Sequence, residues 1–178
     1  MSGPLAGIVL IFLLTCVATA DTWAPLSDGW GRYTNERFGT VIEVPLRIFN
    51  VTEPASSNGD GLEFRAEDGS RFSVYGTYAP YAVMVHFDDY TEHLLIEAQA
   101  KGLALTYRKG GKGWAVFSGH QGPNIVYTKL VEGCEAAHEF SIEYPSSKKR
   151  LYDPVVARLS RTLSCRRVQP EKRLNRAG

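Results

Sequence analysis

The stretch LALTYRKGGKGWAVFSGHQGPNIVYTKLVEGCEAAHEFSIEYP, residues 103–145, decides the fold class. Four runs in it are rich in apolar residues, and glycine-bearing breaks separate them. The runs are Leu103–Arg108, Trp114–Phe117, Ile125–Val131 and Ala137–Tyr144. Alternation with a period of two is typical of β-strands, and tight glycine-bearing breaks favour antiparallel neighbours. The stretch therefore predicts four antiparallel strands in succession.

The last run shows the alternation most clearly. Its even-numbered residues, from His138 to Tyr144, form an apolar face. Its odd-numbered residues, from Glu139 to Glu143, form a polar one. A strand with glutamates on one side only is half-buried. We therefore expect this strand to cover a core with one face.

Three further strands are expected before this stretch. Pro45 should end the first of them, because proline lacks the backbone donor of a strand ladder. Asp68–Gly69 is a strong hairpin signal between the second and the third. The predicted strands are Thr40–Val44, Leu62–Arg65 and Arg71–Tyr78.

The remaining segments between strands show no clear period. Asp21–Arg32, with Trp23 and Trp30, is predicted to be a lead-in whose tryptophans pack on the domain edge. Pro80–His86 is predicted to be irregular or a short strand extension.

Two helices complete the pattern. The first should begin at Asp89, whose spacing to Glu92 suits a capping box, and end at Gly102. The second should begin at Asp153–Pro154, since Asp caps well and Pro is tolerated in the first turn. Its buried face should consist of Val155, Val156, Leu159 and Leu163, with Arg158 and Arg161 pointing away.

This order of elements, three strands, a helix, four strands and a helix, indicates an α+β fold. Helices that cover an antiparallel sheet make a layered domain, here a largely antiparallel sheet of about seven strands covered by two helices. The chain of 178 residues, with 44% hydrophobic and 22% charged residues, suits one domain. We place that domain at residues 21–165.

Residues 1–20 have the pattern of a secretory signal peptide. They contain no charged side chain, Gly7–Leu14 is apolar, and Ala18-Thr-Ala20 suits cleavage after Ala20. The apolar run is short for a membrane span, so no transmembrane segment is expected in the mature chain. A periplasmic or secreted protein is predicted. Lipidation at Cys16 is the alternative, although Thr15 departs from the usual lipoprotein box.

Cleavage would leave two cysteines, Cys134 and Cys165. In an oxidising compartment two such cysteines favour a disulfide, while two free buried thiols are the alternative. Cys134 lies in the turn between the last two strands and Cys165 follows the last helix. A helix of about 16 Å should run back across the sheet toward that turn. A Cys134–Cys165 disulfide is therefore predicted.

Charge is unevenly distributed along the chain. Residues 146–178 have a net charge of +8, whereas residues 1–145 have −7. We interpret the basic end as a solvated helix face followed by a disordered tail over residues 166–178. Association with itself or with an acidic surface is the alternative.

Two groups of residues resemble metal sites. Ser56–Glu67 approaches a calcium loop through Asn58, Asp60 and Gly61, but it has serine where the first carboxylate belongs. The set His86, Asp88, Asp89 and His93 could offer imidazole and carboxylate ligands, but no third His or Cys has ligand spacing. A turn and a helix start explain these residues better, so no metal or cofactor is predicted.

Ser118-Gly-His120 suggests a nucleophile and a base, with His138 as a second possible base. Turn residues and a core histidine explain the same positions, and no Gly-x-Ser-x-Gly elbow is present. No catalytic residue is therefore predicted. The chain also lacks a nucleotide-binding loop and an aromatic-plus-basic nucleic-acid module, so no nucleic-acid partner is expected.

A resemblance to a known family rests on several segments. Tyr33-Thr-Asn-Glu-Arg-Phe-Gly39, Phe140-Ser-Ile-Glu-Tyr-Pro145 and the closing segment Tyr152–Leu163 resemble small, exported, uncharacterised proteobacterial proteins. The likeness covers about residues 30–164, with Val44–Pro45 where the family has Tyr-Pro. It implies a PsbP/Mog1-like α/β/α sandwich. PsbP and Mog1 bind protein partners, so it also implies a binding role, without residues to carry over.

Two functions follow from the sequence. The first is an exported, non-enzymatic binding or accessory protein of unknown partner, for which an envelope protein is a candidate. The alternative is a small secreted hydrolase that uses Ser118 with His120 or His138.

Overall fold

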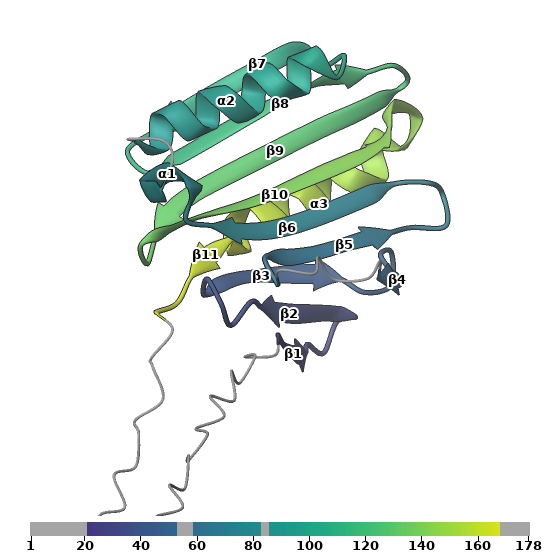
Figure 1. Ribbon diagram of the computed structural model, residues 1–178. Coiled ribbons are helices and arrows are strands. Elements are labelled where there is room, and N and C mark those ends of the chain that lie inside the picture. Colours follow the sequence, from purple (N-terminus) through teal and green to yellow (C-terminus); the bar gives the residue numbers. More distant parts are fainter. Residues whose placement is uncertain (1–20, 53–58, 83–85, 168–178) are drawn as a thin grey trace, which may run out of the picture.

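The computed structural model describes residues 21–52, 59–82 and 86–167 (Figure 1). These residues form two antiparallel sheets and helices that pack on the larger sheet. The α+β class and the predicted covering of a large antiparallel sheet by helices are confirmed.

The larger sheet has seven strands in the order β4-β5-β6-β10-β9-β8-β7. The meander predicted from residues 103–145 forms its second half, with longer strands than expected because the hairpin arms pair almost to their turns. The strands are β4 (Val51–Thr52), β5 (Gly61–Arg65), β6 (Arg71–Thr77), β7 (Ala104–Gly111), β8 (Trp114–Gln121), β9 (Asn124–Gly133) and β10 (Ala136–Pro145).

The smaller sheet has four strands in the order β1-β2-β3-β11. Two features of this sheet differ from the sequence-based prediction. The lead-in supplies β1 and the start of β2, where no strand was predicted, and the strand predicted at Thr40–Val44 belongs to this sheet and not to the larger one. Long-range pairing stabilises the strands of the lead-in, whose own sequence has little alternation. They are β1 (Thr22–Pro25), β2 (Trp30–Thr34), β3 (Thr40–Pro45) and β11 (Ser164–Cys165).

The first long helix, α2 (Phe87–Ala100), begins two residues before the predicted cap. His86 occupies the N-cap without a side-chain cap bond. Asp88 and Asp89 lie in the first turn, where their charge meets the positive end of the helix dipole. Gly102 follows the helix end with φ of 97°, as predicted for a C-terminal glycine. A short helix, α1 (Ala79–Ala82), precedes α2 where irregular chain was expected.

The second long helix, α3 (Lys149–Thr162), begins four residues before the predicted Asp153 cap. A single turn, η1 (Ser146–Lys148), leads into it. Pro154 therefore lies inside the helix, and Asp153 instead accepts a bond from Lys149 at 2.7 Å. Another expectation was wrong, because Arg158 does not point away but faces β3, as described below.

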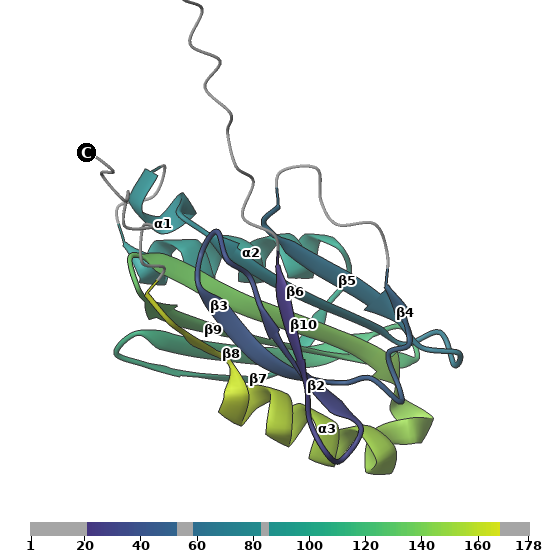
Figure 2. The ribbon, with the colours of Figure 1, turned by 90° about the horizontal axis from the view of Figure 1, so that it is seen from below.

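The two long helices lie on opposite faces of the larger sheet (Figure 2). The principal core joins α3, the smaller sheet and the inward side chains of β5, β6 and β10. Phe140 and Ile142 are fully buried in it, which confirms the predicted apolar face of β10. A second core lies under α2 and includes Leu95, Phe117 and Leu130. Within the described residues no helix is long and apolar enough to cross a membrane.

Candidate functional site

A groove of about 540 Å³ lies between α3 and the strands β7, β8 and β9. It forms because α3 packs over the middle of the larger sheet and leaves the β7 end of that face uncovered. We call it the α3 groove. Its lining residues include Tyr107, Ser118, His120, Ile125, Tyr127, Tyr144, Val156, Ser160 and Arg161.

The floor of the α3 groove combines apolar and aromatic side chains with a small number of polar groups. Tyr127 is half-buried there, and its hydroxyl lies 3.3 Å from Ser160 Oγ on α3. Beside it, Lys129 Nζ donates to the carbonyl of Ser160, and burial lowers the pKa of this lysine. These contacts attach the helix to the sheet at one boundary of the groove, so the wall and the floor are held together.

Ser118 and His120 both line the α3 groove, but they are not joined as a nucleophile and its base. Ser118 Oγ donates to the backbone carbonyl of Val126 at 2.7 Å. A carbonyl accepts this proton as a hydrogen bond but cannot remove it, so the serine is not activated. His120 is exposed on the same strand.

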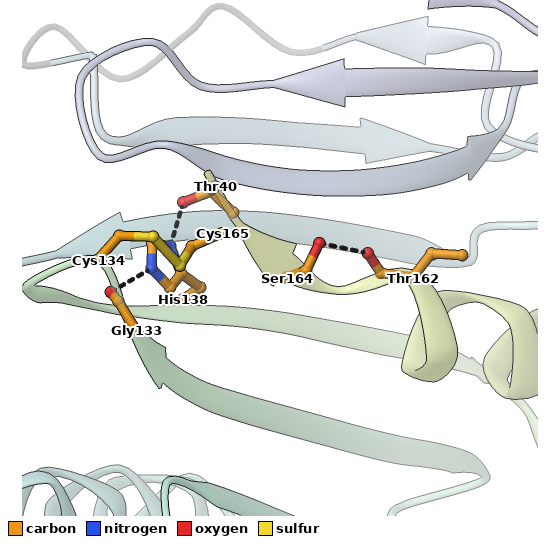
Figure 3. The surroundings of a disulfide bond; sticks show 7 residues. All are labelled: Thr40, Gly133, Cys134, His138, Thr162, Ser164 and Cys165. Atoms are coloured by element: carbon orange, nitrogen blue, oxygen red, sulfur yellow. Dashed lines mark hydrogen bonds between the residues drawn. A yellow bond between two sulfur atoms is a disulfide. The ribbon is translucent and has the colours of Figure 1, made fainter. Parts of the chain in front are cut away.

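His138 lies elsewhere, near the start of β10 and close to the disulfide (Figure 3). It is fully buried, with Nδ1 2.8 Å from Thr40 Oγ1 and Nε2 3.0 Å from the carbonyl of Gly133. The carbonyl requires a proton on Nε2, so the ring accepts from Thr40 at Nδ1. Burial lowers the pKa of His138. Both ring nitrogens are therefore occupied by structural bonds between β10, β3 and the β9–β10 turn.

Two of the residues that resembled metal ligands are engaged in other contacts. His93 Nε2 lies 3.2 Å from Glu97 Oε1 on the same helix, and Asp60 accepts an ion pair from Arg37 at 2.7 Å. Ser56 and Asn58 of the calcium-like loop lie outside the described residues. Across residues 21–52, 59–82 and 86–167, no group of three or more His, Cys, Asp or Glu side chains could hold a metal ion.

Comparisons with known proteins concern the fold. No family model matches the chain, and a search of curated proteins finds no match. Cyanobacterial PsbP (CyanoP) from Synechocystis sp. PCC 6803 superposes with a TM-score of 0.54. The match has 12% sequence identity and covers 78% of this chain and 93% of CyanoP. The fold is PsbP-like. A Pseudomonas aeruginosa protein of unknown function, PA94, matches with a TM-score of 0.45 and 15% identity over 83% of this chain and 99% of its own.

In this PsbP-like fold the predicted disulfide is present. Cys134 and Cys165 are bonded, with their Cα atoms 6.2 Å apart (Figure 3). The bond joins the β9–β10 turn to β11, which pairs with β3 of the smaller sheet. Cys134 and Glu135 both have positive φ, as a two-residue hairpin turn requires. The disulfide therefore links the two sheets at one end of the molecule.

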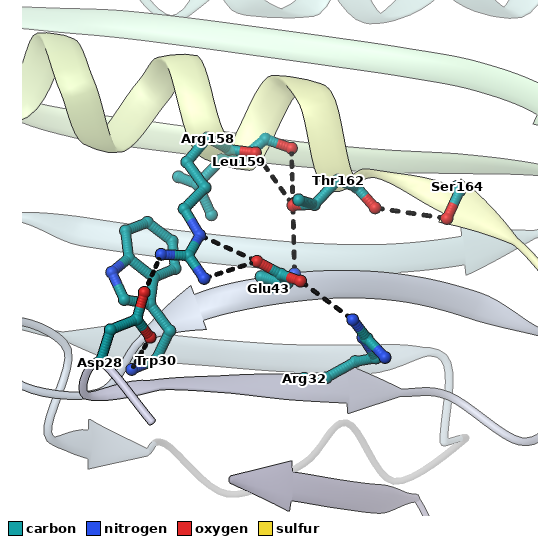
Figure 4. A network of polar contacts seen from close by, with 8 residues as sticks. All are labelled: Asp28, Trp30, Arg32, Glu43, Arg158, Leu159, Thr162 and Ser164. Atoms are coloured by element: carbon teal, nitrogen blue, oxygen red, sulfur yellow. Dashed lines mark hydrogen bonds and ion pairs between the residues drawn. The ribbon is translucent and has the colours of Figure 1, made fainter. Parts of the chain in front are cut away.

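A polar network that the sequence interpretation missed holds α3 to the smaller sheet (Figure 4). Arg158 pairs with Glu43 on β3 at 2.8 Å and with Asp28, and its guanidinium lies 4.1 Å from the centre of the Trp30 ring. Arg32 bonds to the second oxygen of Glu43 at 3.1 Å. A signal existed, because Arg158 is three residues after Val155 and one before Leu159, at the boundary of the apolar face.

Proposed function

We propose that the protein is an exported, non-enzymatic binding or accessory protein and that its partner binds in the α3 groove. The observation that carries this proposal is the groove itself, a concave surface with an aromatic and apolar floor beside α3. Binding sites are typically concave and mostly apolar, with a small number of polar groups that orient the ligand.

The hydrolase alternative has weaker support from the same geometry. Ser118 is hydrogen-bonded to a backbone carbonyl. His120 is exposed and has no bond to Ser118, and His138 is fully buried beside the disulfide. A nucleophile needs a base within hydrogen-bond reach and a third group to orient the base. A groove that binds without reacting agrees better with these contacts.

Export and the domain limits belong to the same proposal. We place the mature domain at residues 21–165, after a cleaved signal peptide; residues 1–20 and 168–178, to which the signal-peptide and tail predictions apply, lie outside the described residues. The disulfide supports this location, because such bonds persist mainly in oxidising compartments. N-terminal sequencing of the mature protein should begin at Asp21. Recovery of the full-length chain from the cytoplasm would contradict the proposal.

Site-specific photocrosslinking tests the binding site. A benzophenone amino acid placed at Tyr107, which is 50% exposed in the groove, should give a discrete crosslinked product in the native envelope. The matched control places the same amino acid at Ile96, which is 56% exposed on α2, on the opposite face of the sheet. The same product from both positions, or none from Tyr107, would contradict a partner in the groove.

A serine-reactive probe tests the alternative. We expect no labelling of the folded protein, since Ser118 lacks a base. Labelling that Ser118→Ala abolishes would instead establish the hydrolase.

A further inference from the structure

We propose that the partner is an acidic, extended peptide segment that adds to the larger sheet as a strand beside β7. This inference rests on the proposed function and names the chemistry of the partner. It follows from three properties of one edge strand: its open backbone, its exposed apolar side chains and its positive charge.

The first property is the open backbone of β7. This strand is the last of the seven-stranded sheet and pairs only with β8. All eight of its residues are exposed, and within the described part of the chain no bond from another element occupies its outer edge. The register of β7 against β8 shifts between Leu105 and Tyr107, and the residues from Tyr107 onward form a regular edge that is a template for an added strand. The opposite edge is less suitable, because β4 has two residues.

The second property is the pair of large apolar side chains on β7. Leu105 is 37% exposed and Tyr107 is 50% exposed. Tyr107 lines the α3 groove, and Thr106 beside it does so too. In an added strand every second side chain would point to the groove side, next to Tyr107. Backbone bonds at the edge and side chains at the groove would thus act together, which is how strand addition combines affinity with specificity.

The third property is charge. Residues 101–113, which contain β7 and its turn, carry four basic and no acidic side chains. Two of these are paired with α2, namely Arg108 with Glu92 at 2.6 Å and Lys101 with Glu97 at 3.8 Å. Lys109 and Lys112 have no ion pair among the described residues, and neither does Arg161 in the groove wall.

These cations decide between two possible occupants. A second copy of this chain would bring the same unpaired lysines close to one another, and like charges across strands destabilise pairing. Positive edge residues also guard a sheet against indiscriminate association. An acidic strand would pair with Lys109 and Lys112 instead of being repelled. Lys109 and Lys112 thus favour an acidic partner and also disfavour a second copy of this chain.

The test starts from a displayed library of random linear twelve-residue peptides, selected against the full mature chain. We expect enriched sequences in which Asp or Glu alternates with Leu, Phe or Tyr. The best selected peptide is then added to isotope-labelled protein, and backbone amide exchange is measured. Strand addition should protect alternate amides of β7, while the β4 edge keeps its exchange rates.

Charge variants complete the test. Lys109→Glu with Lys112→Glu should weaken binding of the selected peptide by roughly tenfold, as attraction at the edge becomes repulsion. The control Arg47→Glu with Arg150→Glu makes the same change in net charge at exposed positions outside the groove and should leave binding within about twofold. Analytical ultracentrifugation should show a monomer.

Each contrary result has a distinct meaning. Selection of peptides that are not acidic, or the absence of selected peptides, would overturn the acidic partner. Peptides that bind in the groove without protecting β7 amides would overturn strand addition and leave the proposed function standing. A dimer whose interface protects β7 would assign the edge to a second copy. Failure of the Tyr107 crosslink, by contrast, would remove the proposed function itself.

Discussion

At the scale of single residues, Glu139 has the most unusual environment. It lies on the polar face of β10, beneath α2, where Tyr90 Oη donates to Glu139 Oε2 at 3.1 Å. Burial raises the pKa of Glu139 to about 7; the bond from Tyr90 opposes this rise, and the nearby charge of Glu97 adds to it. The folded protein therefore holds a proton between pH 4.5 and about 7 that the unfolded chain releases.

Because the pKa of Glu139 is higher in the folded protein than in the unfolded chain, this residue contributes stability below pH 4.5. That contribution is lost as the pH rises through about 7. Glu139→Gln keeps an acceptor for Tyr90 and removes the charge. We expect the variant to be more stable than the parent at pH 8 by about 1–2 kcal/mol. Its free energy of unfolding should also depend less on pH between 4.5 and about 7. Urea unfolding at several pH values measures this. The exposed Glu67→Gln control should change the free energy of unfolding by at most about 0.5 kcal/mol.

Thr40 provides a second residue-scale prediction, through its bond to buried His138. Thr40→Val leaves Nδ1 without a donor inside the protein and should cost about 1–3 kcal/mol in thermal or urea unfolding. Thr52→Val, at an exposed position, is the control. An equal effect of both variants would argue against the buried bond. Because burial lowers the pKa of His138, its contribution to stability should be lost as the pH falls below 6.5.

At the scale of elements, Arg158 determines how α3 sits against the smaller sheet. Its side chain is 25% exposed and bonds to two carboxylates from different segments while it stacks on Trp30. Thr162 adds a contact one turn later, where its Oγ1 accepts from the backbone N–H of Glu43 at 3.2 Å. An apolar helix face alone would allow several positions on the sheet, and these directional bonds select one.

Arg158→Ala should therefore reduce the free energy of unfolding by about 1–2 kcal/mol, because Glu43 loses a partner and Trp30 loses its cation. The control is Arg161→Ala, three residues later on the same helix, which should cost at most about 0.5 kcal/mol. Both are measured by urea unfolding at low and high salt. A loss from Arg161→Ala as large as that from Arg158→Ala would show that the network does not anchor the helix.

At the scale of the whole molecule, the Cys134–Cys165 bond joins the two sheets. The two cysteines are 31 positions apart in the sequence. Replacing both by serine should lower the free energy of unfolding by roughly 3–4 kcal/mol, since the unfolded chain gains freedom. Faster amide exchange in β11 and in its partner β3 should accompany the loss. An unchanged midpoint in the double variant would contradict a stabilising bond.

Local patterns in the sequence determined much of this protein. Alternation over residues 103–145 specified the meander and the buried face of β10. In a strand every second side chain faces the core, so the alternation identifies the buried ones. Gly102 marked the end of α2 through its positive φ. The two remaining cysteines and the order of elements around them indicated the disulfide.

Only the tertiary structure decided which strands pair. Alternation predicts that Thr40–Val44 is a strand, but it does not predict that this strand pairs with β2 and β11 in the smaller sheet. The start of α3 was likewise misplaced, because η1 and packing of Tyr152 in the core override the capping preference of Asp153. Arg158 and the α3 groove depend on how the helix packs across distant strands. Contacts of that kind arise between segments far apart in the chain, and local periodicity does not predict them.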